Sequence, residues 1–230
     1  RRRRQRQMCI RDRYLYILLF SIALAADDHS SEGKIDENCK DITKDNISER
    51  SFTNEYIGTF NGKRIEYTAG LKEKVLYEKD NPDAPQASFF YTEYIAKNGN
   101  QRPVIFSFNG GPGSASLWLH MGVLGPKVIK VPSNASDDGS PPYKIVDNKL
   151  SPLSEADLVF IDPIGTGYSR AIGCHTGEEF WGVNEDPKII AEFIRRWITD
   201  NKRWNSPRYI LGESYGAVSY THLRAHETRP

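Results

Sequence analysis

The sequence has 230 residues, which is enough for one or two domains with a sizeable core. With 38% hydrophobic and 27% charged residues and a formal net charge of +1, it has the composition of an ordinary folded protein. This composition excludes a membrane bundle and a disordered chain, and it does not suggest nucleic-acid binding. Three cysteines, with no Cys-x-x-Cys pair and no histidine cluster, predict neither a disulfide-built scaffold nor a metal site, and we expect no cofactor.

The first 26 residues consist of a basic leader and an apolar stretch. Residues 1–13 contain seven arginines and one acid, whereas residues 14–26 carry no charge and end in Ala23-Leu24-Ala25-Ala26. A basic segment, a short apolar core and an Ala-x-Ala site are typical of a secretory signal peptide. The apolar stretch is shorter than the roughly 20 residues that a membrane-spanning helix needs. We predict a signal-peptide core at 14–26 and an exported protein, in a periplasmic, extracellular or lytic compartment, with an N-terminal membrane anchor as the alternative.

The next part of the chain changes from a polar segment to predicted antiparallel strands. Residues 27–50 contain few large apolar side chains and are expected to be a flexible lead-in. Asn61-Gly62 is a hairpin turn dipeptide between two runs rich in Tyr, Ile and Thr. Runs of this composition predict antiparallel strands at 56–60, 63–68, 73–78 and 87–96.

Three continuous apolar runs are typical of strands buried on both faces of a sheet: residues 104–108, 157–161 and 208–211. Residues 131–142, rich in Pro, Ser, Asp and Gly, predict an exposed loop between the first two.

A helix is predicted between the second and third of these runs. Asp186 is the expected N-cap and Pro187 the expected first helical residue. Apolar side chains then recur at helical spacing at Ile189, Ile190, Phe193, Ile194, Trp197 and Ile198. Strand, helix and strand in this order predict a crossover between parallel strands, and hence an α/β protein.

A Gly-x-Ser-x-Gly pentapeptide, residues 212–216, directly follows the third apolar run. A serine on the sharp turn between a strand and a helix holds its hydroxyl exposed above the sheet, and flanking glycines relieve the crowding of that turn. This position makes Ser214 the candidate nucleophile. The pentapeptide alone is a weak signal, because a glycine-bounded turn with a surface serine has the same pattern.

A second glycine-rich segment, Asn109-Gly110-Gly111-Pro112-Gly113, directly follows the first apolar run. A serine hydrolase stabilises the oxyanion of its tetrahedral intermediate with two backbone N–H groups, one after the nucleophile and one from an earlier glycine-rich loop. Tyr215 and Gly111 are the candidates for these donors. Phosphate binding is the competing interpretation, but the loop has no Gly-Lys-Ser/Thr ending and no Gly-x-Gly-x-x-Gly pattern.

At these residues the chain resembles the serine carboxypeptidases of the α/β-hydrolase superfamily, from about Ile57 to Gly216. The resemblance lies in residues 106–116, Leu124-Gly125-Pro126, residues 157–169 and residues 212–216, and the Trp204-Asn205-Ser206-Pro207 stretch is most similar to a bacterial-type branch. It implies an α/β-hydrolase fold, with a mostly parallel central sheet preceded by antiparallel strands. It also implies that single residues are removed from the free C-terminus of peptides through an acyl-enzyme on Ser214.

The resemblance also implies which residues bind the terminal carboxylate of the substrate: Asn109, the N–H of Gly110, and Glu213. Glu213 can donate a hydrogen bond to a carboxylate only when it is protonated. Many members of the family have a second glutamate that shares this proton, but the matching position here is Val123. This departure puts strict carboxypeptidase specificity and an acid optimum in doubt.

Two further departures concern cysteine and the catalytic triad. Ser114 stands where many members have a cysteine. With Cys9 in the basic leader set aside, Cys39 and Cys174 remain; they form a disulfide or are unpaired. In this superfamily the triad Asp and His follow the serine in the chain. His222 and His226 lie too close to Ser214 for the loop that would carry the base, and His120 and His175 are expected to be packing or solvated residues.

Both ends of the chain resemble translated adapter sequence, so residues 1–13 and 218–230 are expected to be non-native. Residues 51–217 would then be the N-terminal part of an α/β-hydrolase domain that is truncated after its nucleophile and inactive by itself. Two alternatives stay open: an esterase or acyltransferase on the same scaffold, and a secreted binding module that has lost the triad. No nucleic-acid partner is expected, and the oligomeric state cannot be predicted.

Overall fold

The computed structural model describes residues 42–217 except 98, 100, 132–133 and 135–140. The predicted leader, signal peptide and C-terminal tail therefore lie outside the described residues, as does most of the lead-in. Residues 42–50 form no helix or strand. Within the described ranges, no helix has both the length and the apolar character needed to cross a membrane.

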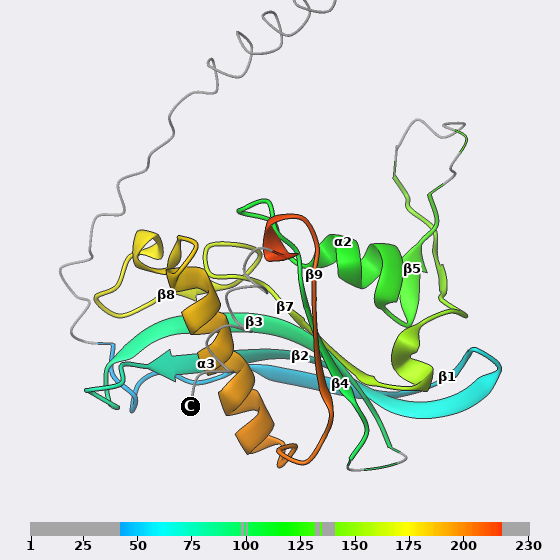
Figure 1. Ribbon diagram of the computed structural model, residues 1–230, viewed down its shortest axis with the longest axis horizontal. Coiled ribbons are helices and arrows are strands. Elements are labelled where there is room, and N and C mark those ends of the chain that lie inside the picture. Colours follow the sequence, from blue (N-terminus) through cyan, green and yellow to red (C-terminus); the bar gives the residue numbers. More distant parts are fainter. Residues whose placement is uncertain (1–41, 98, 100, 132–133, 135–140, 218–230) are drawn as a thin grey trace, which may run out of the picture. The chain divides into compact units, whose positions relative to one another are not determined.

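The described residues form a seven-stranded sheet with the strand order β1-β2-β3-β7-β4-β9, and β8 pairs with β3 (Figure 1). A separate two-stranded hairpin pairs β5 with β6. The strands are β1 (Ser51–Phe60), β2 (Lys63–Tyr77), β3 (Pro85–Ala96), β4 (Val104–Phe108), β5 (Lys127–Ile129), β6 (Ile145–Asp147), β7 (Asp157–Ile161), β8 (Arg170–Ala171) and β9 (Arg208–Gly212). The helical segments are α2 (Leu117–Leu119), η3 (His120–Leu124), η4 (Pro152–Ser154), η5 (Gly177–Phe180) and α3 (Glu185–Asp200).

The N-terminal half of the sheet is antiparallel, as predicted. β1 and β2 form a hairpin whose last pair is Phe60 and Lys63, and Asn61 and Gly62 have φ values of 48° and 78°. Two consecutive positive φ angles define a type I′ turn, which matches the right-handed twist of the strands. The two strands predicted at 63–68 and 73–78 are one continuous strand, β2, because residues 69–72 keep pairing with both β1 and β3. The prediction of a break there was wrong.

The C-terminal half of the described sheet is parallel. β4 lies between β7 and β9 and pairs with both in parallel. The crossover from β7 through α3 to β9 therefore passes over β4, as a right-handed crossover connection allows. Because the carboxyl ends of parallel strands meet at one edge, the loop after β4 and the turn after β9 lie close together at the upper end of the sheet in Figure 1.

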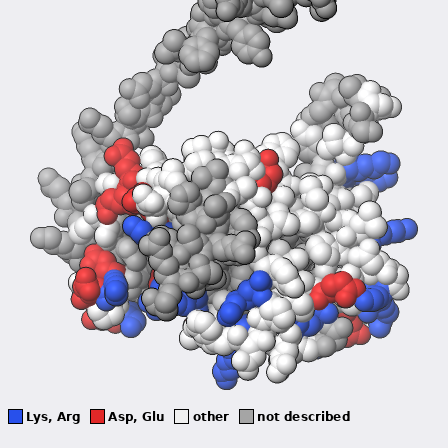
Figure 2. All heavy atoms as spheres, viewed as in Figure 1, with Lys and Arg blue, Asp and Glu red and all other residues white. Residues whose placement is uncertain are grey.

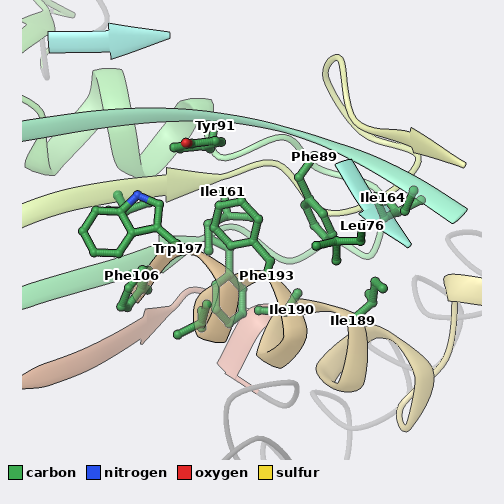
Figure 3. Close-up of a cluster of buried hydrophobic side chains, with 14 of the residues drawn as sticks. Leu76, Phe89, Tyr91, Phe106, Ile161, Ile164, Ile189, Ile190, Phe193 and Trp197 are labelled. Carbon is green, nitrogen blue, oxygen red and sulfur yellow. The ribbon is translucent and has the colours of Figure 1, made fainter. Parts of the chain in front are cut away.

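The central strands β4 and β7 are buried on both faces, whereas β1 and β9 at the two edges are partly exposed, so the prediction of a fully buried strand at 208–211 was wrong. Side chains alternate along β7, so that Val159 and Ile161 face one hydrophobic cluster while Leu158 and Phe160 face the other. α3 covers the first face, and all six apolar residues predicted for its stripe are buried there (Figure 3). On the second face Leu119 of α2 and Leu153 of η4 join Phe160 in the other cluster.

The start of α3 differs from its prediction. The helix begins at Glu185 after Asn184, so Asp186 and Pro187 are its second and third residues instead of its N-cap and first residue. Proline fits there because the first four N–H groups of a helix have no intrahelical acceptor.

A buried ionic cluster joins the amino ends of the parallel strands. Asp157, the first residue of β7, is fully buried and accepts hydrogen bonds from the guanidinium groups of Arg203 at 2.8 Å and Arg102 at 3.2 Å, and from the backbone N–H of Ala96 at 3.0 Å. Arg203 also donates to the carbonyl of Arg102 at 2.6 Å. Each buried charge in this cluster has a partner, which holds the strands in register at the end opposite to the glycine-rich loop.

Candidate active site

Ser214 lies on a tight turn between β9 and the helical residues 215–217. Its φ is 56°, in the left-handed region that a residue with a side chain rarely adopts. The turn is closed by hydrogen bonds from the N–H of Gly216 to the carbonyl of Glu213 and from the N–H of Ala217 to the carbonyl of Ser214, each 3.0 Å long. The side chain of Ser214 is exposed. A strained, exposed serine on a strand-to-helix turn is the geometry of a nucleophile elbow.

Both flanking glycines are required by close backbone contacts. A Cβ built on Gly212 would lie 2.3 Å from the carbonyl oxygen of Gly216, and one built on Gly216 would lie 2.9 Å from the carbonyl oxygen of Phe108. Real Cβ atoms do not approach backbone atoms this closely. The Gly-x-Ser-x-Gly pattern therefore has a steric cause in this turn.

The glycine-rich loop packs directly against this turn. A Cβ built on Gly110 would lie 2.4 Å from the backbone nitrogens of both Tyr215 and Gly216. Gly111 has a φ of 128°, which favours glycine. Among the residues that the structure describes, neither the N–H of Gly111 nor that of Tyr215 has a hydrogen-bond partner. The two predicted oxyanion donors are thus on adjacent segments with free N–H groups.

Asn109 and Glu213 are hydrogen-bonded to each other across these two segments. The amide nitrogen Nδ2 of Asn109 donates to Oε2 of Glu213 at 3.1 Å. Asn109 is 2% exposed, whereas Glu213 is exposed. The structure therefore brings together the two side chains that the resemblance assigned to the substrate carboxylate.

A cavity of about 580 Å³ opens beside the loop and the turn. Asn109, Gly110 and Tyr215 line one part of it. Trp181 lines another part, and its indole N–H donates to the carbonyl of Ile164 at 3.1 Å. Glycines 165 and 177 both lie against its ring, since a Cβ on either would come within 3.0 Å of it. The cavity is large enough for a peptide residue, and one wall of it is a fixed aromatic ring.

Trp181 and its glycine neighbours were not predicted as part of the site. No sequence motif signals this wall, because it depends on the loop after β7 and the segment before α3 meeting in space.

The two histidines among the described residues have other partners than Ser214. His120 is hydrogen-bonded through Nε2 to the hydroxyl of Tyr94 at 2.6 Å and stacks on Phe160, and burial lowers its pKa to about 4. His175 bonds to Glu78 and Glu179 on the surface. Burial lowers the pKa of His175, but the hydrogen bonds and charges of the two glutamates outweigh this and raise it. His120 is thus packed in the core and His175 lies among surface carboxylates, while the expectation that neither is the catalytic base stays a prediction.

The departures from the family pattern have clear places in the structure. Val123 is 60% exposed in η3. Cys174 is disulfide-bonded, and the other two cysteines lie outside the described residues. No group of three or more His, Cys, Asp or Glu residues that could hold a metal ion occurs in the part of the chain that the structure describes.

An exposed serine on an elbow after a parallel strand, next to a glycine-rich loop with free N–H groups, is the arrangement that serine hydrolases of the α/β-hydrolase fold use. The family model described as serine carboxypeptidase matches residues 68–224. The chain belongs to the serine carboxypeptidase family. The α/β class and the sequence of antiparallel and then parallel strands are confirmed, while the bacterial-type branch stays a prediction.

Curated relatives agree with this family. The chain is 30% identical to serine carboxypeptidase-like 9 of Arabidopsis thaliana over 165 residues, covering 68% of this chain and 36% of the relative. It is 29% identical to serine carboxypeptidase-like 11 of the same plant over 175 residues, covering 72% of this chain and 38% of the relative. The chain thus spans little more than a third of the relatives that it matches.

A solved structure, the peroxisomal alpha-beta-hydrolase Lpx1 of Saccharomyces cerevisiae, covers 78% of this chain and is covered to 41%, at 10% identity and a TM-score of 0.39. This likeness is too weak to support a conclusion.

Proposed function

We propose that the whole protein is a serine carboxypeptidase in which Ser214 is the nucleophile. The observation that carries the proposal is the elbow conformation of Ser214, with a φ of 56°, directly beside the hydrogen-bonded pair of Asn109 and Glu213. Hydrogen-bond donors next to the nucleophile can bind the terminal carboxylate of a peptide whose last peptide bond is the one to be cleaved.

In the proposed reaction Oγ of Ser214 attacks the carbonyl carbon of the last peptide bond while a general base takes the hydroxyl proton. The oxyanion that forms accepts hydrogen bonds from the N–H groups of Gly111 and Tyr215. Collapse of the intermediate breaks the C–N bond, and the amine of the terminal residue leaves with the proton. Water then hydrolyses the acyl-enzyme by the same steps and frees Ser214.

The general base in this proposal is a histidine outside the described residues. Within residues 42–217 the two described histidines have other partners, and in this superfamily the triad Asp and His follow the serine in the chain.

The C-terminal carboxylate of the substrate is proposed to accept hydrogen bonds from Nδ2 of Asn109, the N–H of Gly110 and a protonated Glu213. Nδ2 carries two hydrogens, so it can donate to Glu213 and to the substrate at once. Both Asn109 and Gly110 also line the 580 Å³ cavity, which therefore has room for the terminal residue.

The proposed substrates are peptides with a free C-terminus, and no nucleic acid is expected to bind. The charge pattern and the apolar stretch of residues 14–26 support export through the secretory pathway.

Figure 2 shows that the upper part of the viewed face, where Figure 1 places α2 and the loop after β4, has few Lys, Arg, Asp or Glu side chains.

The test compares a blocked dipeptide with its C-terminally amidated form, using the whole protein and its Ser214→Ala variant. Hydrolysis of the free-acid peptide alone, abolished in the variant, is the expected result. Equal hydrolysis of both peptides, or of an ester alone, would favour an esterase or acyltransferase. Peptide binding without hydrolysis of any substrate would favour a binding module.

A further inference from the structure

Ser116 occupies a buried position between the glycine-rich loop and the end of β7. It is 2% exposed, and its N–H and hydroxyl make three hydrogen bonds to neighbouring segments. Its N–H donates to Oδ1 of Asp162 at 2.8 Å, and its hydroxyl accepts from the N–H of Asn109 at 3.2 Å. The same hydroxyl donates its proton to the carbonyl of Ile161. Ser116 therefore connects the first residue of the loop to the last residue of β7.

The side-chain amide of Asn109 has only one orientation that satisfies its neighbours. The N–H of Leu119 donates to Oδ1 of Asn109 at 3.0 Å, and because an N–H can only donate, the carbonyl side of the amide must face α2. Nδ2 then points to Glu213. The backbone bond to Ser116 and the side-chain bond to Leu119 together fix where this nitrogen lies.

Asp162 is itself held in place. Its carboxyl is fixed on one side by the Ser116 N–H, and on the other side it lies against Gly167, where a Cβ would come within 2.1 Å of Oδ2. The connection from β7 through Asp162 and Ser116 to Asn109 is thus a continuous series of hydrogen bonds and close contacts.

We propose that Ser116 is a positioning residue: its buried hydroxyl ties Asn109 to the end of β7 and so holds the Asn109 amide where it binds the C-terminal carboxylate of the substrate. The carboxylate role of Asn109 rests on the proposed function. Ser116 touches neither Ser214 nor the oxyanion donors through any hydrogen bond among the described residues, so its effect is confined to substrates that carry this carboxylate.

The test measures two reactions of the whole protein and its Ser116→Ala variant. The first is hydrolysis of a blocked dipeptide with a free C-terminus, and the second is hydrolysis of a blocked amino-acid ester that has no carboxylate. Removing the hydroxyl leaves the N–H of Asn109 and the carbonyl of Ile161 without partners, so Asn109 shifts. We expect KM for the peptide to rise about tenfold while kcat/KM for the ester stays within about twofold.

Ser114→Ala is the matched control, since Ser114 lies two residues earlier and its hydroxyl has no hydrogen bond among the described residues. It should change neither reaction. Asp162→Ala should act like Ser116→Ala, whereas Asp162→Asn keeps an acceptor for the Ser116 N–H and should have a smaller effect. A crystal structure of the Ser116→Ala variant should show a longer distance between Nδ2 of Asn109 and Oε2 of Glu213.

An equal loss of both reactions in Ser116→Ala would overturn the positioning role in favour of a general structural one. Unchanged peptide kinetics would overturn it as well. Failure of the proposed function is a different result, because it would show in the parent protein, which would then hydrolyse only the ester or neither substrate. The crystallographic distance would still test whether Ser116 positions Asn109.

Discussion

Replacing Gly110 by alanine tests whether the contact between the glycine-rich loop and the elbow controls catalysis. The added Cβ would lie 2.4 Å from the backbone nitrogens of Tyr215 and Gly216 and 2.7 Å from the carbonyl oxygen of Glu213. All three are backbone atoms of the elbow, so no side-chain rotation can relieve the overlap. The loop and the elbow must move apart.

The size of this movement follows from the same contacts. Ordinary van der Waals contact of a Cβ begins at 3.4 Å, so the two segments must separate by about 1 Å. The N–H groups of Gly111 and Tyr215 lie on opposite sides of this gap. A misplacement of about 1 Å costs on the order of 100-fold in rate, and loss of one oxyanion donor costs about 100- to 1,000-fold. We expect Gly110→Ala to lower kcat/KM of the whole protein about 100-fold.

The assay is steady-state hydrolysis of a free-acid dipeptide and of a blocked ester, with a thermal melt to verify folding at the assay temperature. Both substrates should lose activity, since both need the oxyanion donors. Gly122→Ala is the control, because a Cβ at Gly122 would meet nothing within 4 Å. Activity of a folded Gly110→Ala variant within about twofold of the parent would refute the reasoning.

Three further predictions concern stability. Burial lowers the pKa of His120 from 6.5 to about 4, so the unfolded chain binds this proton more tightly than the folded chain. The free energy of unfolding should therefore fall by up to about 3 kcal/mol as pH drops from 6.5 to 4. His120→Gln should remove this loss, as measured by urea titrations at several pH values. Asp157→Ala leaves Arg203 buried without its carboxylate and should cost about 3 to 5 kcal/mol by urea denaturation. Ser107 is 1% exposed and its hydroxyl has no partner among the described residues, so Ser107→Ala should be neutral or raise the melting temperature.

Each of these has a contrary outcome. His175 has a raised pKa, so its contribution to stability is present below pH 6.5 and is lost as pH rises through its folded pKa; a His175→Gln variant that behaved like His120→Gln would contradict the assignment. Asp147→Ala is the control for Asp157→Ala, because the exposed Asp147 pairs with Lys127 on the surface and its loss should cost at most about 1 kcal/mol of stability. If Asp157→Ala cost no more than Asp147→Ala, the stabilising role of the buried cluster would be contradicted. A Ser107→Ala variant that lost more than about 1 kcal/mol would indicate a partner for the hydroxyl.

Local sequence patterns predicted the elements well where one physical cause dominated. The Asn61-Gly62 turn and the apolar stripe of α3 formed as expected, because turn geometry and helical spacing are local properties. Residues 69–72 were missed as strand, since Ala69 and Gly70 have low strand propensity and pairing with strands on both sides overrides it. The β5–β6 hairpin was also not predicted.

For the site, the two glycine motifs located Ser214, Gly110 and Gly111 because their spacing reflects backbone crowding that any such turn requires. Ser116 and Trp181 could not be assigned from sequence. The contacts of Ser116 and Trp181 depend on which strand ends are neighbours in the sheet, and the strand order β7-β4-β9 decides that. Periodicity and motifs describe short stretches of sequence, so they do not predict contacts between distant segments.

The most direct measurement of the central claim is covalent labelling of the whole protein with a fluorophosphonate, followed by mass spectrometry of its peptides. The account predicts one adduct per chain, on the peptide that contains Ser214, with peptidase activity lost in proportion to labelling. It also predicts no adduct in Ser214→Ala. An adduct on another residue that abolishes hydrolysis, or hydrolysis that persists in Ser214→Ala, would contradict it.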